Sequence, residues 1–209
     1  LSESLLNAAD KGTTVVLGYQ IQENGVVQPP DAVRLPALAL GHGFGFINLT
    51  TDPDDFVRRQ KLYNGPDESN PSFASAAAGA LEMNTQRAPV KLNDSTPLIN
   101  YYAPDAFSSI PFYRVLEAAK NGDQPFLQRS FSKRIALISR VGREGEEDLH
   151  STPLYYWPES ARHSTRRTPG AVIQATTIAT VLENRPIQPV GEVSAIAISL
   201  LIAGDGEQR

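Results

Sequence analysis

The stretch PGAVIQATTIATVLEN, residues 169–184, predicts the longest helix of the chain. Before it, KRIALIS at 133–139 is the clearest candidate for a buried strand. The spacing of apolar residues elsewhere in the chain predicts helices over 71–82 and 112–120 and strands over 13–19, 56–63 and 97–102. Because strands alternate with helices, we expect an α/β fold, a layered mixed sheet flanked by helices.

The connecting segments are rich in glycine, proline and aspartate. Residues 25–36 hold three prolines and predict a loop. Residues 41–48 predict a glycine-rich turn that continues into a strand, and residues 51–55 predict a turn built by Asp and Pro.

Composition excludes several functional classes. The 209 residues fit one domain, or one domain with a small appendage. The absence of cysteine excludes a disulfide scaffold, a thiolate zinc site and a thiol nucleophile. A net charge of −4, from 19 basic and 23 acidic residues, argues against a nucleic-acid partner.

Both ends of the sequence are apolar. Residues 1–9 have leucine and alanine at helical spacing and predict the interior of an amphipathic helix, so we expect a domain that lacks its N-terminal part. The apolar run at 193–204 is shorter than the roughly 20 residues of a bilayer span. It is interpreted either as a core strand or helix, or as the start of a span; the polar tail at 205–209 favours the former.

One segment gathers reactive side chains. Asp148, His150, Ser151 and Thr152 place a carboxylate, an imidazole and two hydroxyls after the predicted 133–139 strand. Ligands of open α/β sheets bind outside the carboxyl ends of strands. Three interpretations stay open: a structural loop with local capping bonds, a ligand contact, or a catalytic or metal-binding group.

The other motifs are incomplete. The glycines of 41–45 lack the Gly-Lys-Ser/Thr ending of a phosphate loop. Asp52, Asp54 and Asp55 fail the calcium-loop pattern, because Val57 stands at the sixth position, where that pattern needs glycine. No nucleophile elbow is present. We therefore expect no catalytic residue, no metal site and no cofactor.

The order of seven short motifs resembles the C-terminal two-thirds of a type-two CHASE domain, the cyclase/histidine-kinase-associated sensory extracellular domain of bacterial receptors. The motifs lie at 45–59, 71–78, 98–102, 112–116, 131–139, 148–153 and 169–175, and together they span about residues 10 to 190. Asp55, Ser132 and Ser139 stand where the family has glycine, and Gln174 stands where it has histidine. Aspartate tolerates left-handed backbone, so the turn at Asp55 can survive.

The resemblance implies a place and a role. Residues 1–192 would form an extracytoplasmic (periplasmic) sensory domain, incomplete at its N-terminus, and 193–209 the start of a transmembrane span. The domain would sense a ligand for a bacterial transmembrane signalling receptor with a cyclase, histidine kinase or protein kinase output, and would not itself be an enzyme. The expected partners are a small-molecule or protein ligand, flanking membrane spans and, as an option, a second copy in a homodimer.

For ligand binding we expect hydrogen bonds from Asp148, His150 and Thr152, with Asn100 and Tyr101 on a neighbouring strand. His150 would make the response sensitive to pH. Two alternatives remain: a soluble α/β hydrolase-type enzyme that uses His150, and a dimerisation module that binds no ligand.

Overall fold

The computed structural model describes residues 10–41, 43–65, 69–85, 92, 94–103, 106–140, 148–156 and 167–191, together with 3, 7 and 194. Except for single positions, the predicted helix at 1–9 and the apolar run at 193–204 lie outside the described residues. Within the described residues, no helix is long and apolar enough to cross a membrane.

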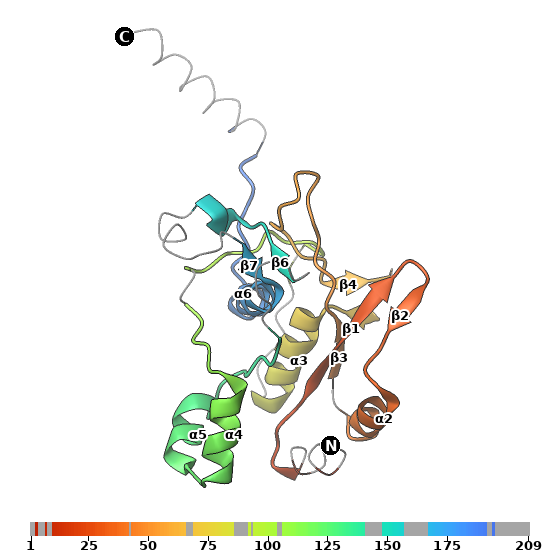
Figure 1. Ribbon diagram of the computed structural model, residues 1–209. Coiled ribbons are helices and arrows are strands. Elements are labelled where there is room, and N and C mark those ends of the chain that lie inside the picture. Colours follow the sequence, from red (N-terminus) through yellow and green to blue (C-terminus); the bar gives the residue numbers. More distant parts are fainter. Residues whose placement is uncertain are drawn as a thin grey trace, which may run out of the picture.

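A small mixed sheet forms one layer of the domain (Figure 1). Its central strand β1 (Val16–Gln22) pairs antiparallel with β2 (Gly25–Val27) and parallel with β3 (Gly43–Phe46). The chain crosses between β2 and β3 through α2 (Asp31–Ala39). The predicted α/β fold, with a mixed sheet flanked by helices, is therefore confirmed.

The predicted loop at 25–36 is wrong, because β2 and most of α2 occupy it. Pro36 lies inside the helix, where a proline removes one backbone donor. The helix nevertheless continues to Ala39, and its first turn carries an ion pair between Asp31 and Arg34, 2.7 Å long. Counting prolines alone overestimated their power to stop a helix.

Two helices, α3 (Phe73–Thr85) and α6 (Gly170–Glu183), form the core (Figure 1). Helix α3 lies between the sheet and α6, with Ala74 and Ala77 against Ile178. The helices predicted at 71–82 and 169–184 are thus confirmed, and the one at 112–120 matches α4 (Phe112–Lys120). Asn184 ends α6 in the left-handed conformation, a common helix stop.

Helix α5 (Gln124–Phe131) was not predicted. Its signal was present in the sequence: Asp123 caps the helix by accepting the Phe126 N–H, and Pro125 lies in the first turn. Helices α4 and α5 pack on each other at one end of the domain (Figure 1).

The strand predicted at 133–139 is wrong. The segment has no regular structure, and Ile135 and Ile138 are 44% and 79% exposed. An apolar run becomes a strand only where a neighbouring strand offers hydrogen-bond partners, and the sheet of the described residues ends at β2 and β3. The prediction that residues 148–152 come after a central strand is therefore wrong as well.

The remaining extended segments form short pairs. β4 (Tyr63–Asn64) pairs with β5 (Asn70–Pro71), β6 (Leu149–His150) pairs with β7 (Thr168–Pro169), and Pro153–Tyr156 is a 3-10 helix. The strands predicted at 56–63 and 97–102 are extended but mostly irregular. They belong to a row of single antiparallel bridges that joins Thr50 to Arg59, Arg59 to Leu98, and Leu98 to Ile187.

The contact between β3 and α3 depends on Gly45. A Cβ at this position would lie 2.5 Å from Phe73 Cα and 2.6 Å from Ser72 O, both backbone atoms. Gly45→Ala should therefore force the strand and helix apart, destabilising the fold by about 1–3 kcal/mol, a loss that thermal unfolding measures. Gly79→Ala is the matched control: it lies in α3 with nothing within 4 Å of its added Cβ, so it should stabilise by about 0.5–1 kcal/mol. Equal effects of the two substitutions would contradict the close approach.

Candidate functional site

Three segments converge beside the N-terminal half of α6, and we call them together the junction: residues 52–59, 98–101 and 148–152. The first of them is a tight turn. The Asp52 N–H donates to Phe56 O, the Asp55 N–H donates to Asp52 O, and Asp55 has a φ of 63°. The predicted turn, with an aspartate in left-handed backbone, is confirmed.

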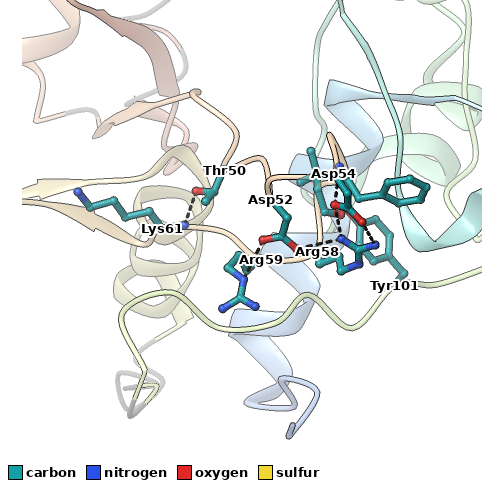
Figure 2. Close-up of polar contacts among 9 residues, drawn as sticks. Thr50, Asp52, Asp54, Arg58, Arg59, Lys61 and Tyr101 are labelled. Carbon is teal, nitrogen blue, oxygen red and sulfur yellow. Dashed lines mark hydrogen bonds and ion pairs between the residues drawn. The ribbon is translucent and has the colours of Figure 1, made fainter.

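The turn is held by paired charges (Figure 2). The Arg58 guanidinium bonds both oxygens of Asp54 at 2.7 Å and Asp52 at 3.1 Å, while Arg59 reaches Asp52 at 3.2 Å. The same guanidinium lies 4.7 Å from the centre of the Phe56 ring, a cation–π contact. Arginine thus neutralises these carboxylates, and the described residues contain no cluster of three acidic or histidine ligands for a metal.

Val57 links the three segments of the junction. Its N–H donates to Ser151 O at 2.8 Å, and its carbonyl accepts the Tyr101 hydroxyl at 2.9 Å. Val57 is completely buried and packs against Ile99 and Ile173 of α6. Burial raises the pKa of Tyr101, so its hydroxyl keeps the proton that it donates.

Residues 148–152 lie between the turn and α6. Asp148 Oδ1 is 3.5 Å from His150 Nε2, and the Asp148 carbonyl accepts the Gly170 N–H that begins α6. The Asp148 and His150 side chains are 53% and 28% exposed. Thr152 is instead fully buried, and its hydroxyl shares a 2.8 Å hydrogen bond with Thr168. Asp148 is thus the exposed member of this segment, and the His150 side chain beside it is partly exposed.

The structure thus brings the five predicted contact residues into one region but gives them different roles. Tyr101 holds Val57, and Thr152 holds Thr168. The backbone N–H of Asn100 donates to the Thr180 hydroxyl on α6 at 3.1 Å. The side chains of Tyr101 and Thr152 and the backbone of Asn100 are therefore bonded to other elements, whereas the Asp148 and His150 side chains pair with each other. Ligand contact by any of them stays a prediction.

Sequence reasoning missed a set of amides, one partly buried and two buried, that bond backbone groups. Asn48 bonds both Ile21 N at 2.8 Å and Ile21 O at 2.7 Å, so its side chain pairs with β1 as another strand would. Gln60 and Gln174 donate to the adjacent carbonyls Asn48 O and Ile47 O. The Oε1 atoms of Gln60 and Gln174 are buried without a partner among the described residues. Nothing in the local sequence distinguishes these amides from exposed ones.

The ion pair between Asp54 and Arg58 predicts a shifted titration of the Asp54 carboxyl group. The Arg58 hydrogen bonds hold the pKa of Asp54 at about 2, below its ordinary value. A lowered pKa stabilises the fold above the ordinary range of Asp, and this contribution is lost as the pH falls towards 2. In Arg58→Gln the midpoint of Asp54, followed by carboxyl-carbon NMR, should rise towards its ordinary value of about 4. An unmoved midpoint would show that Arg58 does not bond Asp54 in solution.

Gly170 and Asp148 should be energetically coupled. A Cβ on Gly170 would collide with Asp148 Oδ1 and lie 3.0 Å from Asp148 Cγ. Gly170→Ala should therefore cost stability in the natural chain but much less in an Asp148→Ala background. Denaturant unfolding of the four variants should give a coupling energy of about 0.5–3 kcal/mol, as for residues in contact. If the effects of the two substitutions on the free energy of unfolding simply add, the Asp148 carboxylate does not contact Gly170 in solution.

Comparison with known families identifies the family of this chain. The model of the CHASE2 domain matches residues 2–204, nearly the whole chain, and so extends beyond the motifs at 45–175. No curated protein and no solved structure matches. CHASE2 domains are sensory domains of signalling receptors. With the sheet, the core helices and the junction all inside the matched range, the chain belongs to the CHASE2 domain family.

Proposed function

We propose that this domain is the extracytoplasmic, ligand-sensing part of a bacterial transmembrane signalling receptor. In the parent protein it would be flanked by membrane spans and would control a cytoplasmic cyclase, histidine kinase or protein kinase. Membership of a family of extracellular sensory domains supports both the role and the location. A homodimer is part of the proposal.

One observation carries the proposal: hydrogen bonds link the exposed Asp148–His150 pair to the chain that follows α6. From this segment, Ser151 O accepts the Val57 N–H. The next residue, Arg58, accepts the Ile99 N–H, and Leu98 O accepts the Ile187 N–H at 3.2 Å. Ile187 lies in the stretch that leaves the domain body beyond α6 (Figure 1). A shift of residues 148–152 would therefore displace the backbone near Ile187, after the end of α6.

The five predicted residues divide between contact and transmission. Asp148 and His150 would bind the ligand, small molecule or protein, because their side chains are accessible. Thr152, Tyr101 and Asn100 would pass the change on, because each bonds another element. A ligand shifts the equilibrium between two conformations of the domain only if it binds them with different affinity.

The test uses the receptor that carries this domain, with its output activity measured against a screen of small metabolites. Asp148→Asn and His150→Gln should reduce the ligand-dependent response, and Glu117→Gln on the distant helix α4 should not. Variants that keep both thermal stability and response would refute the assignment of these residues. Alkaline phosphatase fused after the domain, active only outside the cytoplasm, tests the location separately.

The hydrolase alternative needs a hydroxyl activated by His150. Among the described residues, the polar side chain that contacts His150 is Asp148, and no serine or threonine hydroxyl is bonded to it. Ester or phosphoester hydrolysis that disappears in His150→Ala would nevertheless favour this alternative. Self-association without any ligand response would favour a dimerisation module.

A further inference from the structure

A cleft on the sheet offers a second binding site that shares no residue with the junction. It has a volume of about 420 Å³, within the range of about 300–1,000 Å³ typical of ligand pockets. Its lining includes Tyr19 and Ile21 of β1, Phe44 of β3, Arg34 and Leu38 of α2, and Pro71 of β5. We infer that this cleft binds a small organic anion, a carboxylate attached to an apolar body.

The apolar floor follows from the register of the sheet. Alternate residues of a strand face the same side, so Tyr19 and Ile21 share one face of β1. Phe44 is aligned with Leu17 and therefore belongs to that face as well. The opposite face carries Gly18 and Gly45, which meet Phe73 at the start of α3. One face of the sheet thus receives a helix, and the other leaves aromatic side chains at the cleft.

The charge of the cleft comes from Arg34. Among the described lining residues it is the one ionised side chain, since no aspartate or glutamate lines the cleft. Its Nε and Nη2 both donate to a single oxygen, Asp31 Oδ1, at 3.1 and 2.7 Å. Asp31 is 73% exposed, and such surface pairs are weak, so a ligand carboxylate can share the guanidinium. Arginine is suited to this because its planar fork matches a carboxylate.

Neutral hydrogen-bonding groups complete the lining. The Tyr19 side chain lines the cleft, and burial raises the pKa of its hydroxyl, which therefore remains a donor. Gln28, Asn64 and Asn70 add amides. Aromatic and aliphatic walls with one cation and a few neutral groups disfavour inorganic ions and cationic ligands. This chemistry selects an anion with an apolar body.

The test is direct titration of the isolated 209-residue chain, followed by NMR shifts of the backbone amides. The probe is 3-phenylpropionate; the comparison compounds are its neutral amide and propionate, which lacks the ring. We expect saturable binding of 3-phenylpropionate with shifts at β1, β3 and α2, and clearly weaker binding of both comparison compounds. Arg34→Gln should weaken the binding about tenfold, the value of a charge-assisted hydrogen bond.

Matched variants separate charge from folding. Asp31→Asn should leave binding unchanged or tighten it, because it frees the guanidinium. Leu38→Glu, at a side chain that is 52% exposed, should abolish binding by repulsion without harming the fold. Arg114→Gln on α4 is the control for net charge. Absence of saturable binding, equal binding of the amide, or unchanged binding in Arg34→Gln would each overturn the inference, whatever the result for Asp148 and His150.

Discussion

The backbone of Val57 is the point on which the junction depends. Its N–H donates to residues 148–152, and its carbonyl accepts the Tyr101 hydroxyl. Its side chain packs against α6. Each bond contributes only about 1 kcal/mol net, but an unpaired backbone group at a fully buried position would cost more. The three segments therefore hold their places together, and a change in one must be accommodated by the others.

Charge plays a different part from burial here. The Asp54–Arg58 pair lies at the surface and adds little to global stability, because water screens it. Its value is positional: Arg58 bonds two aspartates of one turn and lies over Phe56, so it fixes the shape of the loop that presents Val57. Apolar contacts therefore stabilise the interior, whereas local ion pairs fix the shape of the turn.

Local signals allowed α3, α4 and α6 to be predicted, whereas α2 and α5 were missed, and the wrong strand at 133–139 is explained by non-local pairing. Helix α4 coincides with its prediction and α6 nearly does, because helical hydrogen bonds and stop residues such as Asn184 lie within a few positions of each other. The run at 133–139 has strand-like composition, yet strand formation also needs a partner segment that composition does not specify. For the candidate site, the sequence predicted ligand contacts for Asp148 and His150, which stay predictions, and it could not show that Thr152 and Tyr101 would be engaged by Thr168 and Val57.

The two unlike faces of the small sheet have an evolutionary consequence. Substitution at Gly45 disturbs the seat of α3, so that face has little freedom to vary. Tyr19 and Ile21 lie on the other face of β1 and line the cleft, so substitutions there change the cleft without adding atoms at the Gly45 contact. Substitutions on that face of β1 would therefore alter what the proposed cleft site accepts, while the Gly45 contact that seats α3 is kept.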